Sequence, residues 1–228
     1  MATFDSTTLQ FENTIPFPDP FPFAPTCIIS DKQGNIFFND EHHLYFIAAK
    51  KERTVKIIEN LFTELLIDKK GYLWAATLQN GLYRLQYIFA NNKLEIIDSV
   101  HFLPGENIRS LFEDSRGNIW VGTRYHGVYR FSKNITTAYT ISNIDQSKGL
   151  SSNWIKGLAE SANGDLWVAS LQGLDKMIQQ NSSYRVFNFS RVNNFYETVT
   201  GMVTDKNHSL WIATNEGIVF SETDSPIS

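Results

Sequence analysis

The sequence predicts an all-β protein built from one repeated unit of strands. Aromatic residues make up 14% of the chain, with 17 Phe, and such side chains favour strands over helices. No segment shows the 3.6-residue apolar period of a helix. A third observation is a motif with a central tryptophan that recurs as GYLWAAT, GNIWVGT, GDLWVAS and HSLWIAT, starting at Gly71, Gly117, Gly164 and His208.

The repeat has a length that identifies its architecture. A degenerate first copy, TCIISDKQGNIFFNDEHHLYFIA, carries Phe at the tryptophan position. Units of about 45 residues that contain four antiparallel strands are typical of β-propeller blades. The motif therefore predicts a β-propeller with one four-stranded blade per repeat. The anchors of the five copies are Phe37, Trp74, Trp120, Trp167 and Trp211.

The third copy shows how each element is assigned. An apolar strand, IRSLFE, leads into DSRG, a tight turn in which Asp can cap the backbone and Gly can adopt a positive φ. The second strand, GNIWVGT, is apolar on both faces and must lie between layers. GVYRFSK forms the third strand and TAYTISN a more polar fourth one.

The tryptophan and a small residue share one face of the second strand, because alternate residues of a strand point the same way. Trp120 is followed two positions later by Gly122. A large ring beside a gap fits close packing of one blade on the next. Burying such a ring removes about 150–250 Å² from water, so we expect all four tryptophans of the motif to be largely buried.

One propeller domain is expected over residues 1–228, with the N-terminal strand completing the last blade. The last copy ends after its third strand, and residues 7–14 resemble an isolated fourth strand. Pairing them would close the ring and remove an exposed sheet edge. The alternative is a fragment of a larger propeller. The five repeats cover approximately 24–59, 60–100, 105–143, 150–190 and 197–228.

Charge and cysteine usage exclude several classes of function. The net charge is −4 without a basic cluster in the sequence, so we expect no nucleic-acid partner. Cys27 is the only cysteine, and a buried small apolar residue is the better interpretation of it than a nucleophile. We find no signal peptide and no membrane span in the sequence, which predicts a soluble chain, periplasmic if it is an excised sensor domain.

The motifs of catalysis and metal binding are missing from the sequence. It contains no G-x-S-x-G, H-E-x-x-H or P-loop pattern, so we expect no catalytic residue, metal or cofactor. The aspartates that begin the D-x-x-G turns are interpreted as caps, since the ligand spacing of a calcium loop is absent. His208 stands at the turn glycine of its repeat and tolerates a positive φ better than most residues.

Topology predicts where a ligand would bind. The loop between the second and third strands and the loop leading into the first strand lie at the same end of each blade, opposite the D-x-x-G turns. These loops differ between copies, and recognition usually resides in such loops. Arg124 could bind a carboxylate and Tyr125 could stack on a sugar ring. The candidate ligand-binding residues are Gln79, Asn80, Arg124, Tyr125, His126, Trp154, Gln172, Asn215 and Glu216.

The repeats resemble a known family at this point. IRSLFEDSRGNIWVGTRYHGVYRF and GLSSNWIKGLAESANGDLWVAS are similar to the two-component regulator propeller repeat, and the resemblance extends over residues 24–220. In that family such propellers form the periplasmic sensor half of hybrid histidine kinases of Bacteroidetes. The resemblance implies signal transduction, with a carbohydrate or other small polar ligand and a fused or associated histidine kinase.

Two other functions stay open. The loop end could recruit a protein partner and act as a scaffold. The repeats also resemble streptogramin-lyase propellers, in which case His126 with Glu216 would be the catalytic pair. The sequence does not identify the ligand.

Overall fold

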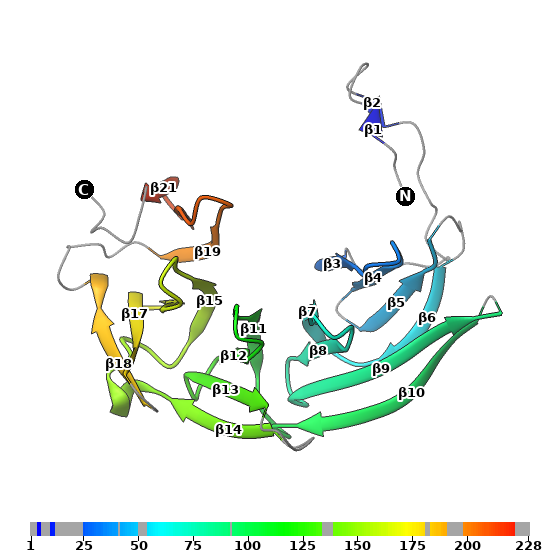
Figure 1. Cartoon of the computed structure of the whole chain (residues 1–228), viewed down its shortest axis with the longest axis horizontal. Helices are drawn as coiled ribbons and strands as arrows, with labels where there is room; N and C mark the ends of the chain where they lie inside the picture. The colour runs from blue at the N-terminus through cyan, green and yellow to red at the C-terminus, as the bar shows by residue number, and fades with distance from the viewer. Residues whose placement is uncertain are drawn as a thin grey trace. The chain divides into compact units, whose positions relative to one another are not determined.

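The structure is a computed structural model that describes residues 4–5, 10–11, 25–40, 42–49, 54–91, 93–133, 139–180, 183–190 and 198–221 (Figure 1). Its contacts group the chain into two compact units. One contains Met1–Ala75 and Tyr83–Phe102, and the other contains Ala76–Leu82 and Leu103–Ser228. The prediction of a single domain is not tested by this division and stays a prediction.

Two four-stranded sheets form the first part of the chain, and each follows the strand order that the repeat predicts. In the first sheet consecutive strands pair antiparallel throughout. It consists of β3 (Cys27–Ser30), β4 (Ile36–Asn39), β5 (His43–Ile47) and β6 (Thr54–Glu59). The second sheet consists of β7 (Phe62–Ile67), β8 (Leu73–Thr77), β9 (Leu82–Ala90) and β10 (Lys93–Phe102).

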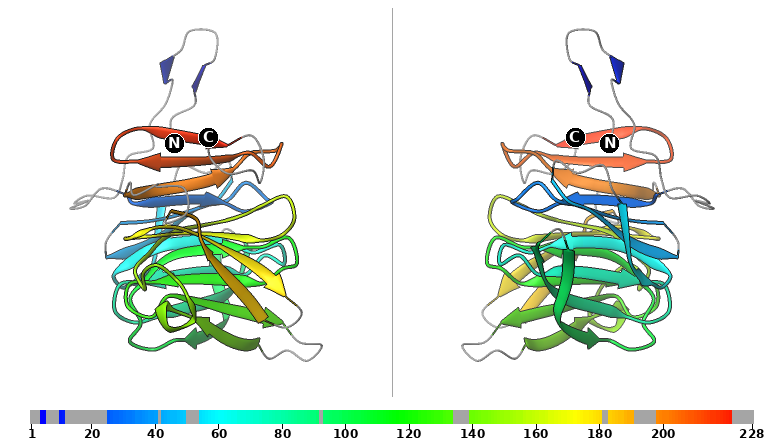
Figure 2. Two further views of the ribbon diagram at one scale, coloured as in Figure 1. Left: turned by 90° about the vertical axis from the view of Figure 1, so that its left-hand side faces the viewer. Right: turned by 90° about the vertical axis from the view of Figure 1, so that its right-hand side faces the viewer.

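Three sheets follow in the second part of the chain. The third contains β11 (Ile108–Glu113), β12 (Ile119–Thr123), β13 (Val128–Lys133) and β14 (Tyr139–Ile144), after which comes a short 3-10 helix, η1 (Gln146–Lys148). The fourth contains β15 (Ile155–Glu160), β16 (Leu166–Ser170), β17 (Gly173–Gln180) and β18 (Ser183–Asn188). The fifth has three described strands, which lie side by side in Figure 2: β19 (Val199–Thr204), β20 (Leu210–Thr214) and β21 (Ile218–Ser221).

The Asp of the D-x-x-G turn holds both the turn and the tryptophan of its sheet. One oxygen of Asp114 accepts from the backbone N–H groups of Arg116 and Asn118, at 3.0 and 2.8 Å. The other accepts from Nε1 of Trp120 at 2.9 Å. Asp68 binds Trp74 in the same way at 2.9 Å. The turn-cap interpretation is therefore confirmed, and the bond to the indole is an addition that the sequence analysis did not contain.

Successive sheets pack through the tryptophan and the small residue beside it. Trp120 is 1% exposed and lies in one apolar cluster with Ile155 and Leu158 of the following sheet. A Cβ placed on Gly122 would lie 2.6 Å from Cγ2 of Ile155. That distance is shorter than any real Cβ contact, so glycine at this position is what lets the two sheets approach.

The expected burial of the tryptophans is confirmed for three of them and wrong for the fourth. Trp74 is fully buried, and Trp167 is 4% exposed in a cluster with Val199 and Ile212 of the fifth sheet. Trp211 is 40% exposed. Trp120 and Trp167 are each covered by the sheet that comes next in the chain, whereas no described sheet comes after β21.

The expected closing strand lies mostly outside the described residues. Within 7–14 only Gln10 and Phe11 are described, as β2 (Gln10–Phe11), and they pair with β1 (Phe4–Asp5). Completion of the fifth sheet by this segment stays a prediction, as does the number of blades.

Candidate functional site at the loop ends of the third and fourth sheets

Backbone hydrogen bonds bring the expected loops together at one end of each sheet. The N–H of Arg124, just after β12, donates to the carbonyl of Asn107, just before β11, at 2.9 Å. The N–H of Leu171 donates in the same way to Trp154 at 2.9 Å. The loop that comes after the second strand thus lies against the segment that leads into the first strand, as topology predicted.

In the second to fifth sheets, the Thr or Ser that ends the second strand closes the following loop. The hydroxyl of Thr123 donates to the carbonyl of Gly127 at 2.9 Å, and it also accepts from the N–H of His126 at 2.9 Å. These bonds fix the backbone while the side chains between them remain free to vary. The same hydroxyl-to-carbonyl bond joins Thr77 to Gly81, Ser170 to Gly173 and Thr214 to Gly217.

Five of the candidate residues lie in three separate loops of this kind. Gln79 and Asn80 lie between β8 and β9, and the N–H of Asn80 donates to Thr77 Oγ1 at 3.0 Å. Gln172 lies between β16 and β17, and Asn215 and Glu216 lie between β20 and β21. All five are exposed. Their convergence on one ligand stays a prediction.

Arg124, Tyr125 and Trp154 come together in space. The guanidinium carbon of Arg124 lies 4.5 Å from the centre of the Trp154 ring and 5.3 Å from that of Tyr125. Tyr125 is 55% exposed, and Trp154 is half-buried. These contacts join two aromatic faces and a cation at the junction of the third and fourth sheets.

Lys156 and Arg109 belong to the same cluster, although the sequence analysis did not include them. Nζ of Lys156 lies 4.1 Å from the centre of the Trp154 ring, on a side chain that starts from β15. Burial and the neighbouring Arg109 and Arg124 lower the pKa of Lys156. Burial and Arg124 likewise lower the pKa of Arg109, which Tyr125 partly offsets. Aligning the repeats would have revealed the pair, because both residues come directly after the isoleucine that begins a first strand.

Three buried polar atoms at this junction have no hydrogen-bond partner among the described residues. They are Oδ1 of Asn107, Nε of Arg109 and Nε1 of Trp154. Buried polar groups of folded proteins nearly always find a partner. Each of these three atoms could form one further hydrogen bond.

His126 is held by Glu106, a partner that the sequence analysis did not include; its expected pairing with Glu216 stays a prediction. Its Nδ1 lies 2.9 Å from a carboxylate oxygen of Glu106, and the carboxylate also accepts from the hydroxyl of Tyr129 at 3.2 Å. The side chain of His126 remains largely exposed. Burial and Glu106 together raise the pKa of Tyr129 to about 12, with a smaller contribution from Asp145.

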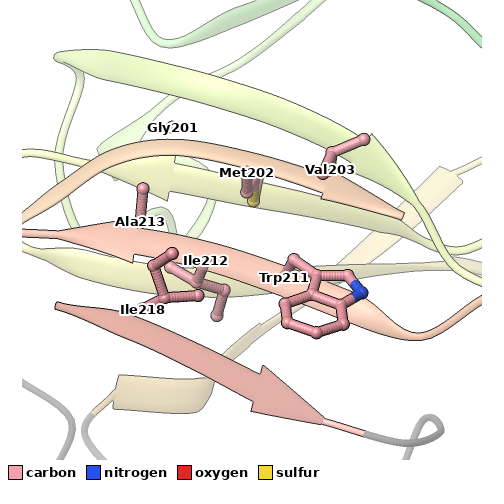
Figure 3. Close-up of a pocket in the computed structure, with 7 residues that line it drawn as sticks. All are labelled: Gly201, Met202, Val203, Trp211, Ile212, Ala213 and Ile218. Carbon is pink, nitrogen blue, oxygen red and sulfur yellow. The ribbon is translucent and has the colours of Figure 1, made fainter. Parts of the chain in front are cut away.

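An apolar hollow lies away from these loops, on the face of the fifth sheet (Figure 3). It has a volume of about 400 Å³ and is lined by Met202, Trp211, Ala213 and Ile218 among others. It lies on the face of the fifth sheet that carries Trp211. In the third and fourth sheets, the face with the corresponding tryptophan packs against the next sheet in the chain. It contains none of the candidate residues.

The described residues contain no candidate metal cluster and no membrane-spanning helix. No group of three or more His, Cys, Asp or Glu side chains there could hold a metal ion. None of the helices in this part of the chain is long and apolar enough to cross a membrane.

The comparison with known families matches the repeat itself. Residues 103–125 match the two component regulator propeller family, and they span β11, its D-x-x-G turn, β12 and the loop with Arg124. The chain carries a two-component regulator propeller repeat. A curated relative, histidine kinase P4 of Formosa agariphila, is 35% identical to this chain over 72 residues, which is 28% of this chain and 5% of that protein.

Solved structures show the same fold. The extracellular domain of a protein described as a hybrid two-component system from B. thetaiotaomicron aligns with a TM-score of 0.69 and 19% identity, over 89% of this chain and 27% of that one. A second such domain from that organism aligns with a TM-score of 0.68 and 23% identity, over 95% and 29%. Virginiamycin B lyase from Staphylococcus aureus aligns with a TM-score of 0.63 and 12% identity, over 90% and 71%. The all-β propeller fold is thereby confirmed, and this chain spans less than a third of the two extracellular domains it resembles.

Proposed function

We propose that this propeller chain is a non-catalytic sensing module that binds a small polar ligand, a carbohydrate in the first place, at the loop ends of the third and fourth sheets. The observation that carries the proposal is Trp154. It lies outside the tryptophan series of the repeats, and its ring is flanked by Arg124 at 4.5 Å and Lys156 at 4.1 Å. Its indole nitrogen lacks a partner among the described residues.

The chemistry of this junction suits a sugar. Aromatic rings such as that of the exposed Tyr125 offer a flat apolar surface, while Arg124 and the orphaned Asn107 oxygen offer hydrogen bonds. Binding sites commonly combine an apolar surface with a few placed polar groups. The loop that carries Arg124 and Tyr125 is fixed by the Thr123 bonds to His126 and Gly127.

A histidine kinase is the partner that we propose for signal output. The support is the similarity to histidine kinase P4 and to the extracellular domains of hybrid two-component systems. Ligand binding at the loop end would then change the activity of a kinase that is linked to or associated with the propeller.

Binding of neutral and acidic oligosaccharides by isothermal titration calorimetry tests the proposal, with Tyr125→Ala and Trp154→Ala as the site variants. Lys206→Ala, at the exposed turn end of the fifth sheet, serves as the control. We expect the site variants to lose affinity by roughly tenfold or more, consistent with the loss of an aromatic stacking surface, and the control to keep it. Binding that survives in both site variants would refute the site. Capture of a protein on the same face, without any sugar binding, would favour the scaffold alternative.

A further inference from the structure

The first strands of the last three sheets each contain a β-bulge at the same position. In the third sheet Ile108 pairs with Thr123 and Ser110 pairs with Gly122, which leaves Arg109 as the extra residue. The fourth and fifth sheets leave Lys156 and Thr200 unpaired in the same way. Bulges often re-aim a side chain next to a binding site.

Two of these bulge residues, Arg109 and Lys156, are positively charged, and both lie near a third cation, Arg124. The ring of Trp154 is contacted by two of them. Nζ of Lys156 lies 4.1 Å from its centre, and the guanidinium carbon of Arg124 lies 4.5 Å from it. Mutual repulsion of Arg109, Arg124 and Lys156 contributes to the lowered pKa of Lys156, after the larger effect of its burial. Three positive charges are thus concentrated in a chain whose net charge is −4.

These cations have no acidic counter-charge in the part of the chain that the structure describes. None of them forms an ion pair with an Asp or Glu there, and Nε of Arg109 is buried without a hydrogen-bond partner. By contrast, Lys176, also close to a tryptophan ring, lies 3.5 Å from the carboxylate of Asp165. Like charges held together without compensation destabilise a fold. Such an arrangement is expected where a ligand supplies the missing charge.

We propose that Arg109, Arg124 and Lys156 form an oxyanion site beside Trp154, so that the ligand of this propeller carries a carboxylate or a sulfate group. The inference rests on the proposed function, because it assigns a charge to the ligand of the same site. Guanidinium groups suit both oxyanions, since each can donate two parallel hydrogen bonds. The ring of the same sugar would lie against Tyr125 or Trp154.

The test uses three matched sugars that differ only at carbon six: methyl galactoside, its 6-carboxylate (methyl galacturonoside) and its 6-sulfate. Inorganic sulfate, titrated at constant ionic strength, is the fourth probe. The variants are Arg109→Gln and Lys156→Gln, and Arg185→Gln is the control because it removes an exposed cation of β18. We expect wild type and control to bind one of the acidic sugars roughly tenfold more tightly than the neutral one, in line with a charge-assisted hydrogen bond. We expect Arg109→Gln and Lys156→Gln to lose that preference.

Protein stability provides a second measurement. Removing Lys156 relieves repulsion from Arg109 and Arg124, so we expect Lys156→Gln to unfold at the same temperature as wild type or higher. A lowered melting temperature would mean that Lys156 supports the fold instead.

The possible outcomes separate this inference from the proposed function. Preference for the 6-carboxylate or for the 6-sulfate identifies which oxyanion is bound. Equal binding of all three sugars, lost in Trp154→Ala but unchanged in Lys156→Gln, would overturn the oxyanion site and leave sugar binding intact. Saturable binding of inorganic sulfate alone, lost in Lys156→Gln, would support the oxyanion site and contradict the carbohydrate class. Binding of none of the four probes would overturn the inference.

Discussion

In three of the propeller repeats, the tryptophan combines a polar bond at one edge with apolar packing on its face. Its Nε1 donates to the turn aspartate, at 2.9 Å in Trp74 and Trp120 and 3.1 Å in Trp211. This bond lies within a single sheet, so it orients the ring independently of the neighbouring sheet. Trp167 stands in the repeat whose turn begins with Ser161 in place of Asp, and it is nevertheless 4% exposed. Packing between sheets is therefore the larger contribution to burial of the ring.

The difference between Trp120 and Trp211 leads to a residue-scale prediction. Trp120→Ala is expected to lower the free energy of unfolding by about 3–5 kcal/mol, the range for a fully buried large side chain. Trp211→Ala should cost clearly less, because the ring is already 40% exposed. Urea denaturation of both variants measures the difference, provided the m-value is unchanged. Equal losses would mean that the face of the fifth sheet is covered in solution.

The residues of the candidate site could be predicted from sequence only in part. Arg124, Tyr125 and Trp154 are predicted by the rule that variable loops gather at one end of a blade. Arg109 and Lys156 lie within strands, where alternation alone does not reveal a bulge that turns a side chain toward the loops. The contact of His126 with Glu106 depends on side-chain reach, which sequence spacing does not encode.

At the scale of an element, β12 and β15 approach each other closely at Gly122. Gly122→Ala is expected to cost about 1–3 kcal/mol, typical of overpacking, because its new Cβ would lie 2.6 Å from Cγ2 of Ile155. Gly201→Ala is the control, since a Cβ there meets nothing within 4 Å.

A double-mutant cycle with Ile155→Ala identifies the cause of that loss. If the steric contact is responsible, the new methyl group should cost less in the Ile155→Ala background than in wild type. Additive losses in chemical denaturation would contradict the packing account.

The hydrogen bond between Tyr129 of β13 and Glu106 predicts that the protein loses stability at alkaline pH. The pKa of Tyr129 is raised to about 12, above its ordinary value of 10.0, so the folded state holds its proton more tightly than the unfolded state. The stabilisation is complete below pH 10 and is lost as pH rises through the interval from 10.0 to about 12. We expect the free energy of unfolding of Tyr129→Phe, measured by urea titration, to fall less than that of wild type between about pH 9 and about pH 11.5, a range that covers most of this window.

At the scale of the whole molecule, the repeat made the fold predictable. The 37 to 47 residues between anchors, with D-x-x-G and the central tryptophan, predicted sheets of four strands, and the structure contains them. The burial of Trp211 could not be predicted in this way, because it depends on the chain segment that covers the fifth sheet and not on the repeat that contains the tryptophan. The same reasoning applies to the number of blades, which a local repeat does not encode.

Deletion of residues 1–15 tests the prediction that the N-terminal strand closes the ring. If residues 7–14 complete the fifth sheet, the truncated protein exposes the edge of β21 (Ile218–Ser221), where unpaired backbone groups favour association with other chains. We expect a lower melting temperature and oligomers in size-exclusion chromatography. Removal of residues 223–228 is the control, and it should produce a weaker change or none. A monomer with the melting temperature of wild type would contradict closure by this strand. The alternative, a piece of a larger propeller, would then be supported, because its fifth sheet would need a strand from outside this chain.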